Sequence, residues 1–197
     1  MKNRFLALVT SKVGCGYAWA TQGETLTEQL LRSLAQQWGE GKYYFGGYSA
    51  EKWLGKECFD CSGLIVWALQ QLGLTEKDYT AEGLYAVCDK VSQPQSGDLC
   101  FNKNLTHVGI YVGSGLYLHA KGTKYGVVIT DQYTFVKFGR LRMLQPKQEK
   151  PHWAEDPHSY LSQRIVVHEK RFDDKITRGE TFALLAQQQA QSKSLRG

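Results

Sequence analysis

The chain has 197 residues, of which 42% are hydrophobic and 12% aromatic, so it can bury the core of one ordinary domain and is not disordered in composition. Its formal net charge is +5, but no Lys- and Arg-rich run is interleaved with aromatic residues, which argues against a nucleic-acid partner. No stretch approaches the roughly 18 consecutive apolar residues of a membrane span, and the apolar run at residues 5–9 is too short for a signal peptide. We therefore expect a protein without a membrane span that is synthesised in the cytoplasm without a signal peptide.

The first half of the chain is predicted to be mainly helical. The clearest helix begins after Asp60, a suitable N-cap, and stops at Gly73. Between them apolar residues recur at i, i+3, i+4, i+7 and i+8, so this helix is expected to face the core. A Gly- and Tyr-rich loop is expected at 39–50. The predicted helices cover residues 1–12, 24–38, 61–72 and 80–88.

After this helical part the apolar period changes to two, which is typical of strands separated by turn residues. Helices followed by an antiparallel sheet predict an α+β fold. Three of the four prolines lie between Pro146 and Pro157, so we expect residues 1–145 to form one domain and residues 146–197 a linker with a small helical module. The predicted strands cover residues 98–101, 107–113, 116–122, 127–133 and 138–144.

Cys58 and Cys61 stand three residues apart in the stretch ECFDCSG, a spacing that suits a metal clip, a redox pair or a single nucleophile. A zinc site would need His107 and His119 as further ligands, but these lie twelve residues apart on separate predicted strands. Compact zinc modules space their histidines by about three to five residues. A redox pair needs both thiols at a helix start, and Cys58 lies upstream of the cap. Neither a metal nor a cofactor is therefore expected.

The nucleophile interpretation uses more of the sequence. With Asp60 as the cap, Cys61 is the first residue of the helix, where the helix dipole and free backbone N–H groups favour the thiolate. Such a position can lower a cysteine pKa from about 8.5 to below about 7.5, and the same N–H groups can receive an oxyanion. A cysteine nucleophile then needs a histidine base and a group that orients this base.

Two predicted strands supply both groups. A three-residue loop at 113–115 would place Gly109 opposite His119 on the neighbouring strand. In that register His107 and His119 are diagonal neighbours on one face, roughly 7 Å or less apart at Cβ. We therefore expect a histidine pair to which the buried helix presents Cys61.

The segments FDCSGLIVWAL, QSGDLCF, HVGIYVG and LYLHA, in this order over residues 59–122, resemble the NlpC/p60 family of papain-like cysteine peptidases. The resemblance implies a papain-like α+β core in which a nucleophile helix packs on an antiparallel sheet. It also implies that Cys61 is the nucleophile, that His107 is the base, and that His119 is the third residue, which holds the His107 ring.

The same resemblance implies substrate-binding residues. Asp60 and Ser62 would line the substrate side of the nucleophile. The family has a Tyr-x-Trp-Gly-Gly-like segment whose Tyr hydroxyl lies near the cysteine. Here GYAWATQG keeps Tyr17 and the Trp but lacks the double Gly, whereas YYFGG offers Tyr43 and the double Gly but has Phe for Trp. We favour Tyr17, and we expect residues 22–57 to be an insertion that shapes the pocket.

The C-terminal stretch at residues 152–187 resembles a surface-layer-homology-type motif, a module that helps proteins hold cell walls. A single unit of this kind cannot bury its own core well. We therefore expect it to dock on the catalytic domain or on another copy of the chain, which would give a homo-oligomer.

Together the resemblances imply a hydrolase of bacterial peptidoglycan that cleaves the stem peptide, usually after γ-D-glutamate, by a Cys-His-His mechanism. A wall hydrolase without a signal peptide suits a phage endolysin, released through a membrane pore to act on the wall. A wall-associated enzyme and a cytoplasmic peptide-recycling enzyme are the alternative settings. Two other functions stay open. One is an amidase that cuts between muramic acid and L-alanine with the same triad, and the other is a non-enzymatic wall-binding or zinc-stabilised protein.

Overall fold

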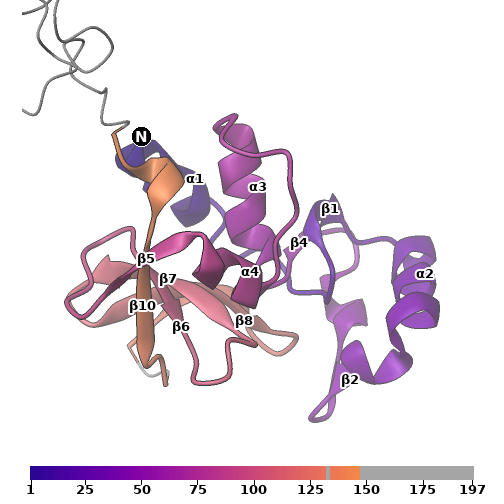
Figure 1. Ribbon diagram of the computed structural model, residues 1–197. Helices are drawn as coiled ribbons and strands as arrows, with labels where there is room; N and C mark the ends of the chain where they lie inside the picture. The colour runs from indigo at the N-terminus through magenta and orange to yellow at the C-terminus, as the bar shows by residue number, and fades with distance from the viewer. Residues whose placement is uncertain (132–133, 147–197) are drawn as a thin grey trace, which may run out of the picture. The chain divides into compact units, whose positions relative to one another are not determined.

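The computed structural model describes residues 1–131 and 134–146. Its largest element is a six-stranded sheet in which every neighbouring pair is antiparallel, in the order β5-β10-β6-β7-β8-β9 (Figure 1). A period of two predicts alternating burial for a sheet with one face on the core, but β6, β7 and β8 each have three consecutive buried residues. The strands are β5 (Cys88–Val91), β6 (Leu99–Phe101), β7 (Val108–Gly113), β8 (Leu116–Gly122), β9 (Gly126–Thr130) and β10 (Lys137–Leu141).

The helix α3 (Gly63–Gln71) is the central helix of the core. Most of its residues are buried, because it is covered by α1 (Lys2–Thr10) as well as by the sheet. A nearly continuous apolar sequence is what such an enclosed helix requires. A short helix, α4 (Ala81–Ala86), lies beside β6, and the 3₁₀ turn η3 (Arg142–Leu144) follows β10. These elements share one core cluster with the sheet, and it includes Cys61.

A second cluster of buried residues lies mainly in the segment between β1 (Gln22–Thr25) and β4 (Glu57–Phe59), two strands that pair with each other, and also includes Ala18 and Cys58. We call residues 26–56 the lobe. It stands beside the sheet in Figure 1, where α2 and β2 are labelled. The lobe contains α2 (Glu28–Trp38), η1 (Glu40–Lys42), β2 (Tyr44–Phe45), β3 (Tyr48–Ser49) and η2 (Ala50–Trp53).

The lobe packs against the turn between β8 and β9. The Trp53 indole Nε1 donates a buried hydrogen bond of 2.7 Å to the Thr123 carbonyl. Gly126 allows this contact, because a Cβ at that position would lie 2.9 Å from the Trp53 ring and 2.3 Å from the Cys15 carbonyl oxygen. The lobe and the β8–β9 turn therefore meet through close packing as well as through a hydrogen bond.

The predicted helices are confirmed, with shifted ends. Residues 24–25, predicted to be helical, belong to β1, and α2 begins at Glu28, because the Thr27 hydroxyl caps it by accepting from the Leu30 N–H. The regular part of α3 begins at Gly63, two residues after the predicted start at Cys61. The sequence analysis also missed the β2–β3 hairpin, whose turn residues Gly46 and Gly47 both have positive φ. A Gly-Gly pair is a known signal for such a turn.

The predicted α+β class is confirmed, and each of the five predicted strands has a counterpart. The last strand ends at Leu141, because residues 142–144, predicted as its end, form the 3₁₀ turn η3, and β5 is an additional strand. Ile110 pairs with Leu118, which places Gly109 opposite His119 as predicted. The predicted three-residue loop at 113–115 is wrong, because a bulge lets Gly113 pair with Leu116 and leaves two residues in the turn. The pairing near His107 and His119 is still the predicted one, because the bulge lies between Tyr111 and Gly113, closer to the turn.

The first compact unit of the chain runs from Met1 to Pro146. The predicted surface-layer-homology-like module lies in residues 147–197, outside the described residues. Within residues 1–131 and 134–146, no helix is both long and apolar enough to cross a membrane.

Candidate active site

Cys61 lies in the turn that leads into α3, with only 7% of its surface exposed. Its sulfur receives backbone N–H groups from Val108, Ser62 and its own residue, and these favour the thiolate. Burial acts more strongly in the opposite direction and, with the nearby Asp60 carboxylate, raises the pKa of the Cys61 thiol to about 12. The expectation that the helix start lowers this pKa is therefore wrong, since the regular helix begins later and the thiol is desolvated.

Asp60 holds the turn that carries Cys61. One carboxylate oxygen accepts from the Gly63 N–H at 2.7 Å and from the Ser62 hydroxyl at 3.1 Å, and the other accepts from the Ala20 N–H at 2.9 Å. The N-cap residue of α3 is therefore Ser62 rather than the predicted Asp60, but the Asp60 carboxylate binds the first N–H of the helix and ties it to the segment before β1. Burial raises the pKa of Asp60, while the three hydrogen bonds oppose this shift. Ser62 is engaged with Asp60, so both predicted substrate-binding residues also support the turn.

His107 and His119 form the predicted pair. His107 Nε2 lies 2.9 Å from His119 Nδ1, which is hydrogen-bond distance. His107 immediately precedes β7, and His119 lies in β8. On the far side, His119 Nε2 lies 3.3 Å from the hydroxyl of Thr130 in β9. Three polar side chains thus follow one another across neighbouring strands: His107, His119 and Thr130.

Burial keeps both histidines neutral. It lowers the pKa of His107 to about 4 and that of His119 to about 3, the latter helped by the charges of His107 and Lys121. A neutral His107 can act as a general base, because one of its ring nitrogens is able to accept a proton. The resting site therefore combines a neutral thiol at Cys61, whose sulfur receives the Val108 N–H, with a neutral imidazole on the preceding residue, His107.

Three residues that the sequence analysis did not name support the pair. The Asn102 side-chain oxygen accepts from the backbone N–H groups of Thr106 and His107, at 2.9 and 3.1 Å, and so shapes the loop before β7. Phe135 stacks on the His107 ring, with centroids 5.9 Å apart and planes 12° apart. The third is Thr130, which a predicted strand over 127–133 could have suggested. Nothing in the local pattern of the sequence indicates the other two.

Gly109 makes room for this arrangement. A Cβ there would lie 2.9 Å from the Phe135 ring and 3.0 Å from the His119 Cβ. The first separation is shorter than real Cβ contacts and the second is tighter than most of them, so a side chain would displace the aromatic ring or the histidine.

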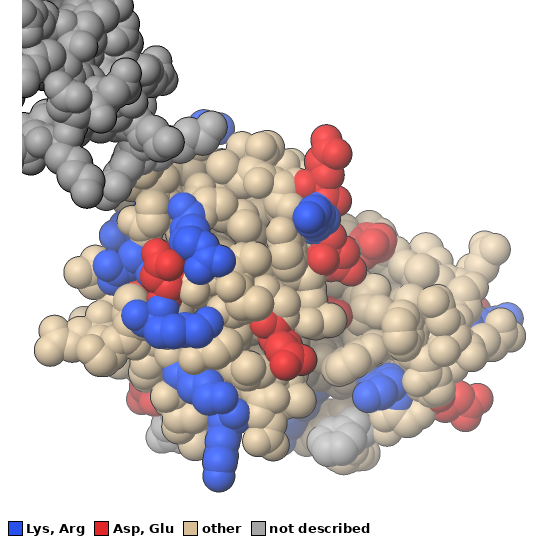
Figure 2. Space-filling model, viewed as in Figure 1, with Lys and Arg blue, Asp and Glu red and all other residues tan. Residues whose placement is uncertain are grey.

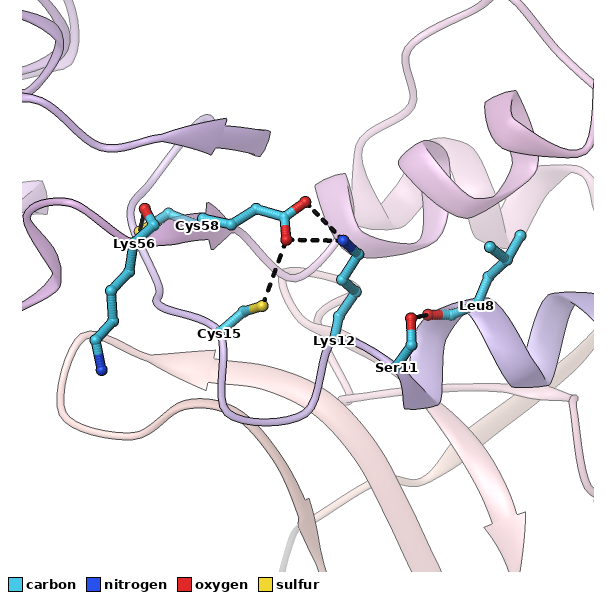
Figure 3. Close-up of polar contacts among 7 residues, drawn as sticks. Leu8, Ser11, Lys12, Cys15, Lys56 and Cys58 are labelled. Atoms are coloured by element: carbon cyan, nitrogen blue, oxygen red, sulfur yellow. Dashed lines mark hydrogen bonds and ion pairs between the residues drawn. The ribbon is translucent and has the colours of Figure 1, made fainter.

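Cys58 faces away from this site. It is fully buried in the cluster of the lobe, and burial raises the pKa of its thiol to about 12. On the same strand Glu57 receives the Lys12 ammonium at 2.7 Å and the Cys15 thiol at 3.6 Å (Figure 3). All five cysteines are free, and the described part of the chain contains no group of three or more His, Cys, Asp or Glu that could hold a metal ion.

The two candidate tyrosines lie in different clusters. Tyr17 is 9% exposed and belongs to the core cluster that contains Cys61. Tyr43 is fully buried in the lobe cluster, where its hydroxyl donates to the Trp19 carbonyl at 3.2 Å. Burial, with the charge of Asp60, raises the pKa of Tyr43 to about 12. Tyr17 thus shares the core cluster with Cys61, whereas Tyr43 is close enough to Asp60 to feel its charge, and the choice of Tyr17 stays a prediction.

Comparison with known proteins places these features in a family context. The sequence profile described as "NlpC/P60 family" matches residues 39–143, more than half of the chain. The bifunctional muramidase/DL-endopeptidase CwlT of Bacillus subtilis is 31% identical over 131 residues, which are 60% of this chain and 36% of that protein. The murein DD-endopeptidase MepH of Escherichia coli is 31% identical over 134 residues, covering 61% of this chain and 47% of that protein. The chain thus spans less than half the length of these two relatives.

Two solved structures share the fold. The peptidoglycan hydrolase RipB of Mycobacterium tuberculosis superposes with a TM-score of 0.50 at 20% identity, covering 74% of this chain and 65% of that one. The P60 domain of an antigen from M. avium subspecies paratuberculosis gives 0.51 at 19% identity, covering 74% of this chain and 96% of that one. The predicted combination of a helix and an antiparallel sheet is therefore confirmed.

Proposed function

The chain belongs to the NlpC/P60 family, and from this premise we propose that it is a cysteine peptidase that hydrolyses an amide bond in the stem peptide of bacterial peptidoglycan. The relatives support this class, since CwlT and MepH are both named as endopeptidases. Within the class we propose the bond between γ-D-glutamate and the diamino acid.

The proposed roles follow the order of side chains in the site. Cys61 is the nucleophile and His107 the base. Because Nε2 of His107 lies against His119, its Nδ1 is the nitrogen that takes the thiol proton. His119 orients the His107 ring, and Thr130 orients His119 in turn. The single observation that carries the proposal is this 2.9 Å histidine contact, in which His107 directly precedes Val108, the residue whose N–H reaches the sulfur of the buried Cys61.

The proposed reaction proceeds in two halves. In the first, His107 takes the proton from Cys61 as the sulfur attacks the carbonyl carbon of the amide, and backbone N–H groups at the turn stabilise the oxyanion. Collapse breaks the C–N bond, and protonated His107 gives its proton to the leaving amine. In the second half, His107 takes a proton from water, whose oxygen attacks the thioester. Collapse breaks the C–S bond, and His107 returns its proton to the leaving sulfur, which regenerates the thiol. The new carboxylic acid loses its proton to water and leaves as a carboxylate.

Mass analysis of digested walls tests this proposal. Purified peptidoglycan is incubated with the chain, and the soluble fragments are analysed by mass spectrometry. Cleavage after γ-D-glutamate gives fragments that keep the first two stem residues on the sugar. The release of intact stem peptides would instead identify an amidase. Binding to walls without any new fragment would favour the non-enzymatic alternative and contradict the proposal.

The setting of this activity stays a prediction. The sequence analysis expects a phage endolysin that acts on the wall after release. Lysis of cells from outside, compared with lysis after expression together with a pore-forming protein, would test that expectation.

A further inference from the structure

A group of lysine and aromatic side chains joins the lobe to the end of β8. We call it the lysine patch. Its lysines are Lys52 in η2, Lys56 before β4, Lys121 in β8 and Lys124 in the β8–β9 turn. Its aromatic members are Tyr48, Trp53 and Tyr125.

Each lysine of the patch lies over an aromatic ring. The Lys52 and Lys56 ammonium groups are 4.6 and 5.5 Å from the Trp53 ring centroid. Lys121 and Lys124 are 4.5 and 5.2 Å from the Tyr125 ring, and Lys124 also lies 4.9 Å from that of Tyr48. Such contacts orient an ammonium group while they leave its charge available.

Two hydrogen bonds between the lobe and the β8–β9 turn, which we call the joint, hold the patch together. The Lys52 ammonium donates to the Lys124 carbonyl at 2.9 Å, next to the Trp53–Thr123 hydrogen bond that fastens the lobe. The lysines come from segments far apart in the sequence, which is why no basic run is visible in the sequence itself. The joint therefore holds the four charges together on one part of the surface.

The charge of the patch is not balanced by carboxylates. The ion pairs within the described residues are Lys12–Glu57, Arg32–Glu28, Arg140–Asp98 and Arg142–Asp89, and none includes a patch lysine. Of the two nearest acids in sequence, Glu57 is paired with Lys12, whereas Glu51 accepts only from the neutral Tyr44 hydroxyl, so at most one of them offsets the four lysines.

A basic region on another side of the molecule differs in this respect. Figure 2 shows Lys and Arg side chains over the β5–β10 side with acidic side chains among them. There Arg140 and Arg142 are paired with aspartates. The surplus positive charge of the lysine patch therefore distinguishes it from an ordinary solvated surface.

The patch begins beside the proposed catalytic pair. Lys121 follows His119 by two residues in β8, and its charge acts on the His119 ring. From there the lysines lead away through the β8–β9 turn to the lobe. A ligand on the patch would therefore lie next to the substrate without occupying the nucleophile.

We propose that the lysine patch binds a phosphodiester-linked polyanion of the bacterial wall. Four unpaired ammonium groups on one surface match a polymer that carries an anion in every repeat, because each is a compact point charge suited to phosphate oxygens. The exposed rings of Tyr48 and Tyr125, at 37% and 46%, offer faces for sugar or polyol units between the anions. Stem-peptide carboxylates lie only near the scissile bond, where Lys121 alone could reach them.

The test uses immobilised poly(glycerol phosphate) and the full chain with Cys61→Ser, so binding is measured without catalysis. The patch variant is Lys52→Gln/Lys56→Gln/Lys124→Gln; Lys121 is left intact because it adjoins His119. Loss of three phosphate contacts is expected to weaken binding by at least about tenfold and to reduce the log–log salt slope by about two to three. Lys124→Gln alone, an exposed side chain, is expected to weaken binding about threefold and serves if the triple variant does not fold.

The matched control removes the same net charge elsewhere, at the exposed Lys2, Lys77 and Lys90. This triple Gln variant is expected to bind within about twofold of the parent. If both triple variants bound poly(glycerol phosphate) equally weakly, the loss of binding would come from the lower net charge alone, and the proposal would be overturned. So would an absence of binding by the parent, or equal binding of polyglutamate or of single-stranded DNA with the same number of charges. Because turnover of a small stem peptide should be unchanged in the patch variant that retains Cys61, failure here is distinct from failure of the proposed peptidase function.

Discussion

Cys58 and Cys61 lie only three residues apart, yet Cys61 is buried in the core cluster and Cys58 in the lobe cluster. In β4, Cys58 packs in the lobe cluster and the next residue, Phe59, in the core cluster, as alternation along a strand requires. The chain then turns at Asp60, so Cys61 enters the core beside α3. The comparison teaches that cysteine spacing alone does not define a site. The strand and the turn between the two thiols send them into different environments.

The largest expected difference between the two regions is in the cysteines. Cys61→Ser should abolish wall lysis, because it removes the nucleophile, while Cys58→Ser should keep most of the activity, since its hydroxyl can still reach the Lys56 carbonyl. Lysis is followed by turbidity, and thermal unfolding is measured on the same samples. Equal loss in both variants, together with stoichiometric zinc in the parent protein, would restore the metal-clip interpretation.

Within the core, replacing His107 should reduce turnover more than replacing His119. His107→Ala should lose nearly all turnover, because no group remains to move the proton. His119→Asn should lose less, by about a hundredfold or more, since it only releases the His107 ring. The comparison is made with a soluble stem peptide under saturating conditions. Full activity of His119→Asn would mean that another residue orients the base.

The pH profile tests the burial of the core site. Because the pKa of His107 is lowered to about 4, the base stays neutral and turnover should persist at pH 5. A histidine with its ordinary pKa of about 6.5 would leave only about 3% of the base neutral at that pH. An acid limb near pH 6.5 in kcat/KM would therefore contradict the described site.

The same shift predicts a loss of stability on acidification. The unfolded histidines take up protons near pH 6.5, whereas the folded ones do so only near pH 4 and 3. The unfolded state thus binds more protons in this window, so the free energy of unfolding should fall as the pH falls from about 6.5 towards 4. Thermal unfolding of the parent and of a His107→Gln/His119→Gln variant measures the contribution of the pair.

Two Gly→Ala substitutions, one in the core and one in the lobe, compare how closely each region is packed around a glycine. Gly109→Ala places a Cβ against Phe135 and His119 and should reduce turnover about tenfold, with a cost of about 1–3 kcal/mol in the free energy of unfolding. Gly41→Ala in the lobe meets no atom within 4 Å and should change neither quantity measurably. Similar effects of both changes would show that the histidine pair does not depend on this close approach.

The smallest effect is expected at the joint between the regions. Trp53→Phe removes the indole donor to the Thr123 carbonyl and should cost about 1–2 kcal/mol in stability. Turnover of a small peptide should stay unchanged, because the joint contributes no reacting group. Hydrogen exchange at the β8–β9 turn is the sharper measurement, and its amides should exchange faster in the variant.

The core was more accessible to prediction than the lobe for a physical reason. Its strands and α3 carry regular apolar periods, so the register that brings His107 to His119 could be derived from the sequence. The lobe consists of elements of two to four residues besides α2, too short to show a period. The Asn102 loop, the Phe135 stack and the pKa of Cys61 depend on tertiary burial, which no local pattern encodes.

The protonated state of Cys61 has a consequence for chemical durability. Alkylating and oxidising reagents attack the thiolate, and a thiol whose pKa is about 12 presents almost none of it at neutral pH. The side chain is also 7% exposed, so small electrophiles have little access. The resting chain should therefore react slowly with iodoacetamide and outlast mild peroxide. Its reactivity should then appear only when a base removes the proton of the thiol.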